Sequence, residues 1–378
     1  MTSQSYANWK HIRPAESGAA NPNVRSDRPR RVMVVGLGNI GSFLTTLVSQ
    51  RVDSICLVDH DIVEQHNVEN QFYEPQDIGR SKVDVLADRL ASVAPRLNVQ
   101  THACELQDVP LGHFADVDVV MAGLDSLGAR QSLSEIVYPL QVPYIDGAVG
   151  DPFNVRVQVL LPGAACLECS WGAGQYRQLT TEYSCRPRGG GSGSRISAPR
   201  TNAPAAAGAA TASLMVAQLE KIFSEQRAGE SYEINGDLFA GRLVTSRRRR
   251  NAACHYSHAT ASSLLRVEKP FQAVTIGDVI EAANSFHAGN DRQLPEAELF
   301  FRRGVLNQVF DRGLFKDTSS ITLTDLQSHH NVRIAELGLT SLDRVTLESV
   351  TRDDQAKLIS QICFEHESLV HPETIHQS

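Results

Sequence analysis

The sequence predicts an α/β protein with a mostly parallel sheet, helices on both of its faces, and a small α+β module at the C-terminal end. Two observations lead to this prediction. From Arg31 onward, short apolar runs alternate with amphipathic helical patterns, which is typical of a parallel sheet covered on both faces. The first run, Val32–Val35, ends in the glycine-rich stretch GLGNIG at residues 36–41. This is the outline of a strand, a glycine turn and a helix start that can hold a phosphate.

The expected elements follow one another in alternating order, so the sheet is expected to be Rossmann-like. Strands are expected at Val32–Val35, Ser54–Val58, about Val99–Ala103, Val117–Ala122 and Tyr144–Ala148, and helices at about Ile40–Gln50, Ser81–Ala94 and Ala129–Tyr138. The helix over 81–94 is supported by apolar residues at helical spacing. The segment Val155–Leu161 alternates apolar and polar residues, as an antiparallel strand does.

Composition divides the chain further. Residues 1–28 are polar and are expected to form an N-terminal arm, and the nucleotide-binding domain is expected over 29–265. Within that domain, Gly, Ser, Ala and Pro dominate residues 186–212, which predicts a flexible crossover loop. A helix is expected from Ala212 to about Phe223. The composition changes again near Glu268, so residues 266–378 are expected to form the separate α+β module, ending in a helix.

Overall composition excludes several classes of protein. The 378 residues are 42% hydrophobic and 21% charged, as in an ordinary soluble globular protein. The net charge of −7 argues against a general nucleic-acid binder, which needs a basic face. The run Arg247–Arg250 is expected to be a solvated strand end. Apolar stretches fall short of the roughly 18 residues that span a bilayer, and seven cysteines do not suggest a secreted disulfide framework. The expected location is the cytoplasm, away from membranes.

The glycine stretch does not by itself decide which nucleotide is bound. Gly36 permits the tight turn, Gly38 lets the backbone approach a phosphate, and Gly41 lets the helix pack on the strand. Asp59 follows the second strand, where a carboxylate can bond ribose hydroxyls. Both ATP and a nicotinamide dinucleotide have such a ribose, and a plain strand–helix turn would need similar glycines.

The residues after Asp59 resemble one family. The stretch DHDIVEQHNVENQFYEPQDIGRSK covers residues 59–82, and GLDSLGAR covers 123–130. Their Asp-x-Asp, Asn, Gln, Asp-Ile-Gly-x-x-Lys and Asp-x-x-x-x-Arg elements closely resemble the adenylation domain of the ubiquitin-activating superfamily, the ThiF/MoeB/HesA family. The resemblance extends over about residues 31–260. It implies that residues 29–265 are a ThiF-type adenylation domain that uses ATP and Mg²⁺.

The resemblance also implies a role for each matching position. Nucleotide contacts are expected from Gly36, Gly38, Gly41, Asp59, Asp61, Asn67, Asn70, Gln71, Lys82, Asp125 and Arg130. In this set Lys82 neutralises charge as the α-phosphate is attacked, and Asp125 binds magnesium. Adenylation brings a carboxylate close to a phosphate, and these two anions repel each other. A lysine and a metal ion are therefore expected to reduce the repulsion. Taken singly, Lys82 could be a surface lysine and Asp125 a helix N-cap.

One position departs from the family pattern. The family has an arginine that contacts phosphate where this chain has Asn70, and asparagine can hydrogen-bond a phosphate but carries no charge. Either another cation substitutes or adenylation is weakened. The candidates are Arg80, Arg130, Arg25 and Arg28; the last two lie in the arm, and in this family an N-terminal arginine can cross into a partner's site.

Two cysteine-containing segments suggest a metal site. Cys166-Leu167-Glu168-Cys169 has the spacing of half a zinc knuckle, and Cys254-x-x-x-His258 is within metal-ligand spacing. The family commonly has Cys-x-x-Cys in the second segment, but Ser257 occupies the second position here. We expect a Cys₃His tetrahedron around Zn²⁺, with His255 as the reserve ligand. The alternative is two unrelated turns that carry thiols.

The other cysteines are expected to differ in role. Cys185 precedes the crossover loop, where thioester-forming family members often have a cysteine. It is flanked by Arg186 and is close to Arg188, which favour a thiolate; an incidental loop thiol is the alternative. Cys56 and Cys104 lie in strand patterns and are expected in the core. Cys363 is expected in the final helical region.

These observations favour an activating enzyme that adenylates the C-terminal glycine of a ubiquitin-like or sulfur-carrier protein and then transfers the acyl group to Cys185. The resemblance implies a homodimer, and the C-terminal module is expected to dock the carrier or a conjugating enzyme. The alternatives are a superfamily enzyme acting on a peptide, small molecule or tRNA base, and a non-catalytic nucleotide-binding scaffold. A nicotinamide dehydrogenase would explain neither Lys82 nor the cysteine pairs.

Overall fold

The structure is a computed structural model. It describes residues 29–150, 153–182, 203–224, 229–256, 258, 261–288, 298–300, 321–322, 329–350 and 357–365. The expected N-terminal arm, Cys185 and residues 186–202 of the expected crossover loop lie outside the described residues.

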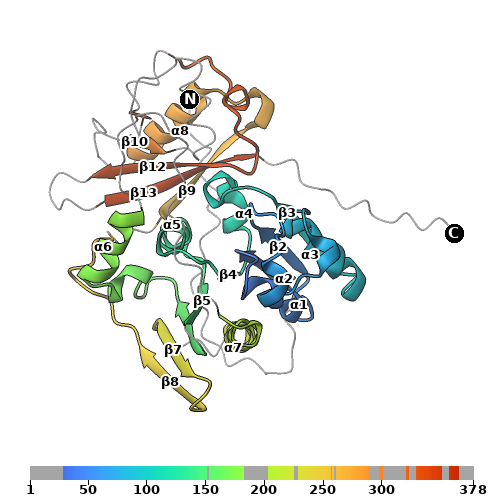
Figure 1. Ribbon diagram of the computed structural model, residues 1–378. Helices are drawn as coiled ribbons and strands as arrows, with labels where there is room; N and C mark the ends of the chain where they lie inside the picture. Colours follow the sequence, from blue (N-terminus) through green and yellow to red (C-terminus); the bar gives the residue numbers. More distant parts are fainter. Residues whose placement is uncertain are drawn as a thin grey trace, which may run out of the picture.

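An eight-stranded sheet carries the site, in the order β3-β2-β1-β4-β5-β6-β7-β8 (Figure 1). Its strands are β1 (Arg31–Val35), β2 (Ser54–Val58), β3 (Asn98–His102), β4 (Val119–Ala122), β5 (Tyr144–Gly150), β6 (Asn154–Leu160), β7 (Tyr232–Asp237) and β8 (Arg242–Arg247). The first five pair in parallel and the last three are antiparallel. The prediction of a mostly parallel, Rossmann-like sheet is therefore confirmed, including an antiparallel strand close to 155–161.

Helices cover both faces of this sheet (Figure 1). They are α1 (Gly41–Ser49), α2 (Asn67–Asn70), α3 (Lys82–Val93), α4 (Leu111–Ala115), α5 (Leu127–Val137), α6 (Ala173–Glu182) and α7 (Ala205–Phe223). On one face, Leu44 of α1, Leu86 of α3 and Met215 of α7 pack with the apolar strand residues. On the other face, Phe114 of α4 and Leu133 of α5 do the same. Because apolar residues project to both faces of β1, β2 and β4, these three strands are nearly continuous apolar runs, whereas the edge strand β3 is mostly polar and exposed.

Short 3₁₀ helices connect several of these elements. They are η1 (Pro75–Asp77), η2 (Leu106–Asp108), η3 (Leu167–Ser170), η4 (Phe271–Ala273) and η5 (Ile334–Leu337). In the first of these, Glu74 and Asp77 form a reciprocal capping box, which fixes the turn that leads into α3.

The strand order changes direction between β1 and β4, where the chain crosses from one half of the parallel sheet to the other, and a ligand crevice is expected at this point. Ligands bind at this point, outside the carboxyl ends of the strands, in open α/β sheets. Gly36 follows β1 with a φ of +78°, a conformation that favours glycine. A Cβ on Gly36 would lie 3.1 Å from the carbonyl oxygen of Gly123, which follows β4. The two loops are thus held close together at the expected phosphate site.

Gly41 permits an even closer approach, and substituting it is expected to destabilise the protein strongly. A Cβ on Gly41 would lie 1.8 Å from the Gly36 carbonyl oxygen, and this neighbour is backbone that cannot rotate away. We expect Gly41→Ala to lower the free energy of unfolding by about 3 kcal/mol, the upper part of the range for overpacking. Urea denaturation measures the change. Gly174→Ala is the matched control: Gly174 lies in α6 with open space around its Cβ position, so alanine there should be neutral or slightly stabilising.

A second, five-stranded sheet has the order β11-β10-β12-β13-β9. Its strands are β9 (Ala261–Pro270), β10 (Glu298–Phe300), β11 (Ile321–Thr322), β12 (Arg344–Val350) and β13 (Lys357–Glu365), and α8 (Ile276–Ala288) shares their apolar core. This sheet lies beside α4 (Figure 1). The amide of Gly112 in α4 donates to the carbonyl of Leu342, at 2.7 Å. A Cβ on Gly112 would lie 2.2 Å from that carbonyl oxygen, so this contact also depends on glycine.

The structure corrects three expectations. Helix α7 begins at Ala205, seven residues before the expected start, because the alanine-rich end of the expected crossover loop is a strong helix former and buries Ala207 and Gly208. The final described element is the strand β13, so Cys363 lies in a strand and not in a helix. Arg248 is buried, so the arginine run is not wholly solvated. Among the described residues, no helix is long and apolar enough to cross a membrane.

Candidate functional site

The glycine loop is fixed by bonds from three directions. The amide of Gly36 donates to Val58 O at 2.9 Å. The amide of Leu37 donates to the Asp59 carboxylate at 2.6 Å, and the hydroxyl of Tyr73 donates to Leu37 O at 2.7 Å. Asp59 is 9% exposed; burial raises its pKa, opposed by the charge of Lys82. The other carboxylate oxygen accepts the amide of Asp61. Asp59 therefore holds the loop as well as occupying the expected ribose position.

Lys82 is placed at the start of α3 with its ammonium group paired to Asp61. The Nζ atom lies 2.8 Å from Asp61 Oδ2, and the side chains are 6% and 50% exposed, respectively. The Lys82 amide also donates to Asp61 O. Partial burial would raise the pKa of Asp61, but the hydrogen bond and charge of Lys82 lower it. Lys82 is thus a nearly buried cation at the carboxyl edge of β2, and it is not a surface lysine.

The amide side chains expected near the triphosphate gather around α2. The carbonyl of Asn70 accepts from Asn39 Nδ2 at 2.7 Å. The Oδ1 atoms of Asn39 and Asn70 and the Oε1 of Gln71 are buried and have no hydrogen-bond partner among the described residues. Buried polar atoms normally have a partner, so these three acceptors could bind a hydrogen-bond donor of a ligand, although not a phosphate oxygen. Asn67 differs: its Oδ1 accepts the amide of Glu64 at 2.8 Å, which gives it a structural role in the turn.

The predicted magnesium ligand lies in the loop between β4 and α5. Asp125 follows β4 and is exposed. The N-cap of α5 is Ser126, whose hydroxyl accepts the amide of Ala129 at 3.1 Å, so the carboxylate of Asp125 is not used as the helix cap. Oxygen ligands of this kind suit Mg²⁺.

Arg130 is held by neighbouring protein groups. Its guanidinium is buried and forms an ion pair with Asp146 of β5, and it also donates to Leu124 O. Asp146 is fully buried and accepts the hydroxyl of Tyr144 at 3.0 Å. Arg130 therefore fixes the loop that carries Asp125, and a direct nucleotide contact stays a prediction.

The arginines proposed to replace the family's charge at position 70 are largely committed. Arg80 pairs with Asp88 and Asp77, and Arg130 with Asp146; Arg25 and Arg28 lie outside the described residues.

Restoring the charge with Asn70→Arg is therefore expected to lower the KM for ATP roughly tenfold, the effect of one charge-assisted phosphate contact. Asn70→Gln, which adds length without charge, should leave the KM near the wild-type value. An unchanged KM in Asn70→Arg would mean that another cation already fills this position.

Sequence reasoning missed two side chains that hold the segment between α2 and η1. Tyr73 is 5% exposed and reaches back to the glycine loop. Arg89 of α3 donates to Phe72 O, lies 4.5 Å from the Phe72 ring centroid and pairs with Asp77 at 3.3 Å. Both contacts join residues far apart in the chain, and neither residue type or spacing signals them.

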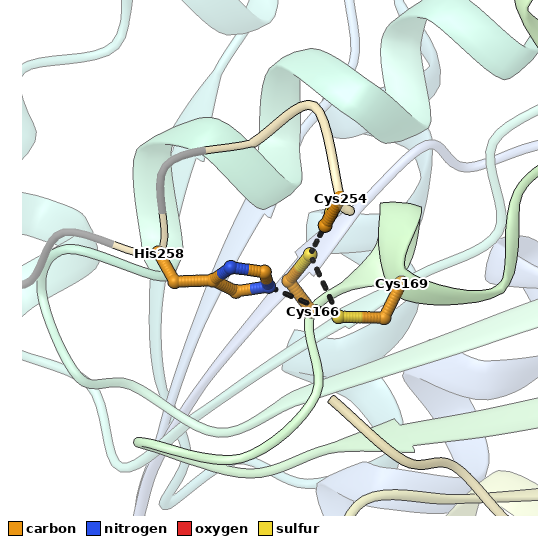
Figure 2. A group of neighbouring side chains, drawn as sticks. All are labelled: Cys166, Cys169, Cys254 and His258. Carbon is orange, nitrogen blue, oxygen red and sulfur yellow. Dashed lines mark hydrogen bonds between the residues drawn. The ribbon is translucent and has the colours of Figure 1, made fainter. Parts of the chain in front are cut away.

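A second cluster forms where η3 meets the loop after β8 (Figure 2). The Sγ atoms of Cys166 and Cys169, and those of Cys166 and Cys254, are each 3.7 Å apart, and Cys169 Sγ lies 3.0 Å from His258 Nε2. All four ligand atoms lie within 4.8 Å of one another. Three thiols and one imidazole are a donor set that could hold a metal ion.

The structure distinguishes between the two histidines. His258 has a φ of +55°, and this left-handed conformation turns its ring into the cluster. His255 instead stacks on Tyr176 of α6, with ring centroids 4.2 Å apart. Burial raises the pKa of the Cys166 and Cys254 thiols and lowers the pKa of His258. Thiolates are therefore disfavoured here unless a cation accompanies them.

A groove of about 680 Å³ lies over the ends of β5 to β8, and Ala148, Arg156, Asn235 and Arg242 are among its lining residues. Arg156 Nη2 lies 3.6 Å from the Asp146 carboxylate, which also binds Arg130. The groove is thus connected, through Asp146 and Arg130, to the loop that carries Asp125.

The loops at the carboxyl ends of β1, β2 and β4 thus contain the glycine loop, the buried Asp59 and Lys82 and the exposed Asp125, on an α/β Rossmann-like sheet. The ThiF family model matches residues 23–260. The chain belongs to this family, as the sequence motifs predicted.

Individual relatives match a smaller part of the chain. The NEDD8-activating enzyme E1 catalytic subunit of Dictyostelium discoideum is 30% identical over 172 residues, which are 41% of this chain and 39% of the relative. Ubiquitin-like modifier-activating enzyme 5 of the same organism is 25% identical over 163 residues, 39% of this chain and 43% of the relative. The chain thus spans less than half the length of these curated relatives. A structure of E. coli MccB with ATP covers 60% of this chain and 66% of that chain, with 17% identity and a TM-score of 0.47.

Proposed function

We propose that the chain is an ATP-dependent activating enzyme that adenylates the C-terminal glycine of a ubiquitin-like or sulfur-carrier protein. The observation that carries the proposal is the presence of a nearly buried Lys82 on one side of the glycine loop and an exposed Asp125 on the other. Family membership and the named relatives, which are activating enzymes for ubiquitin-like proteins, support the same class of substrate.

In the proposed reaction, the carrier's terminal carboxylate attacks the α-phosphorus of ATP, and pyrophosphate leaves with the electrons of the broken P–O bond. Lys82 would stabilise the charge that develops on the α-phosphate. Asp59 would bind the ribose, and the buried amide oxygens of Asn39, Asn70 and Gln71 would accept hydrogen bonds from donor groups of the nucleotide. Asp125 would hold Mg²⁺, which when bound neutralises phosphate charge. The carrier tail would reach the crevice through the groove that Arg156 and Arg242 line.

In a second proposed step, the Cys185 thiolate attacks the adenylated carbonyl and displaces AMP, which leaves the carrier as a thioester. We further propose that Cys166, Cys169, Cys254 and His258 hold a structural Zn²⁺, that residues 266–378 form a docking module for the carrier or a conjugating enzyme, and that the enzyme is a homodimer. The match between the donor set and tetrahedral zinc coordination supports the zinc assignment.

ATP–pyrophosphate exchange tests the proposal in wild type and Asp125→Ala, with and without candidate ubiquitin-like proteins that end in glycine. Exchange that requires both the carrier and Asp125 is the expected result. Exchange without a carrier would instead identify a small-molecule or peptide substrate. Absence of exchange with every carrier tried, together with retained ATP binding, would identify a nucleotide-binding scaffold.

A further inference from the structure

We infer that Arg248 is a positioning residue of the metal site, which holds the Cys166–Cys169 turn and offsets the negative charge of its thiolates. This inference rests on the proposed zinc site. It concerns a residue that the sequence places in an arginine run with no apparent connection to the cysteines.

The contacts of Arg248 join the metal cluster to the sheet. Its side chain is 4% exposed, and its amide donates to Ser231 O at 2.8 Å. The Nη2 atom donates to Leu167 O at 2.8 Å and to Cys166 O at 3.4 Å. These two carbonyls belong to the turn between the first two cysteine ligands. The guanidinium therefore fixes the backbone that sets the direction of both thiols.

The positive charge of Arg248 can offset a negative charge at the metal site. Three thiolates and a neutral imidazole around Zn²⁺ carry a net charge of −1, and Cys166 and Cys169 are buried. A buried charge is costly unless an opposite charge compensates it. Arg248 supplies a fixed positive charge directly behind the turn, and groups of this kind outside the ligand shell orient and tune the ligands.

Arg248 is itself held in place from the other side. Its Nη1 atom lies 2.9 Å from Glu233 Oε2 in β7. Gln158 Nε2 donates to the same oxygen, and Asn235 Nδ2 donates to Oε1, each at 2.6 Å. These two amides hydrogen-bond the Glu233 carboxylate and hold it in place. The carboxylate in turn orients the guanidinium through Nη1, while Nη2 donates to the turn.

The neighbouring arginines provide a contrast within the same run. Arg247 has a side chain that is 80% exposed and lies 3.3 Å from Glu230. Arg249 is exposed. The alternating direction of side chains along an extended segment thus turns only Arg248 inward among these three.

The test measures zinc affinity of the full-length protein by competition with a chromophoric chelator, using zinc alone as the probe. Arg248→Gln keeps a hydrogen-bond donor and removes the charge, Arg248→Lys keeps the charge, and Arg249→Gln is the control. We expect Arg248→Gln to bind zinc roughly 10–100-fold more weakly, as loss of an outer-shell partner does. Arg248→Lys should recover most of the loss, and Arg249→Gln should match wild type. The visible spectrum of the cobalt-substituted Arg248→Gln protein should change as the thiolate ligands shift.

Wild-type affinity in Arg248→Gln, or equal losses in Arg248→Gln and Arg248→Lys, would overturn the inference and leave the zinc site intact. Failure of the wild-type protein to bind zinc would overturn the zinc site itself, so the two failures are distinguishable. If Arg248→Gln does not fold, Arg248→Lys still decides: a tenfold or greater loss of zinc affinity in a folded lysine variant contradicts a role for the charge.

Discussion

Replacing Lys82 with methionine is expected to reduce ATP–pyrophosphate exchange by roughly 10²–10³-fold, the effect of removing one group that stabilises developing charge in a transition state. Two anions meet in adenylation, and the Lys82 ammonium is a nearly buried cation at the carboxyl edge of the sheet, near the glycine loop. Its 6% exposure keeps its charge poorly screened by solvent, which makes the electrostatic contribution larger than that of a surface lysine. Exchange assayed at saturating ATP and carrier measures the change.

The fold should survive this substitution. Methionine fills the space of the lysine stem, and Asp61, the carboxylate left behind, is 50% exposed and remains hydrated. The lost ion pair should therefore cost no more than about 1 kcal/mol. Arg96→Met is the matched control because it removes one exposed positive charge beyond the other end of α3. Exchange within threefold of wild type in Lys82→Met would remove Lys82 from the chemistry, whatever Arg96→Met does.

The parallel half of the sheet could be predicted because its buried strands are short apolar runs; Ser54–Val58 matches β2 residue for residue. The antiparallel strands β7 and β8 could not. Tyr232–Asp237 mixes glutamate, asparagine and glycine, and β8 is exposed along its whole length. Their pairing is decided by neighbouring strands and not by local pattern. The start of α7 was missed for the opposite reason, because an alanine-rich segment between prolines and glycines resembles a linker until its packing is known.

The candidate site also contains residues that could be predicted from the sequence and residues that could not. Ligand spacing predicted which cysteines meet, and the structure places His258 with them and His255 against Tyr176. Motif residues such as Asp59 and Lys82 could be predicted from the sequence because the chain brings them to one edge of the sheet in a fixed order. Residues that support the site from a distance, such as Arg248, have no sequence signal. Their importance comes from contacts that span scores of residues and form only in the folded sheet.

Removal of zinc is expected to lower the melting temperature by roughly 10 °C. A ligand present at about a thousand times its Kd stabilises the folded state by about 4 kcal/mol, and each kcal/mol corresponds to about 2–4 °C for a domain of the size of residues 29–265. The metal would join η3 to the segment after β8, and Cys166 and Cys254 are 88 residues apart in the chain. Differential scanning calorimetry before and after dialysis against a chelator, followed by zinc addition, measures the loss and its recovery.

The cysteine variants separate metal binding from simple packing of thiols. Cys169→Ser should melt like the chelated wild type and gain nothing from added zinc, because a serine hydroxyl is a poor ligand for this ion. Cys363→Ala, which removes a half-buried thiol in β13, should keep the full response to chelator. If the cluster were four neutral groups packed together, the chelator would leave the melting temperature unchanged. The pKa values of the Cys166 and Cys254 thiols are raised. Protons compete with zinc for these sulfurs, so the stabilisation by zinc should decrease as the pH falls.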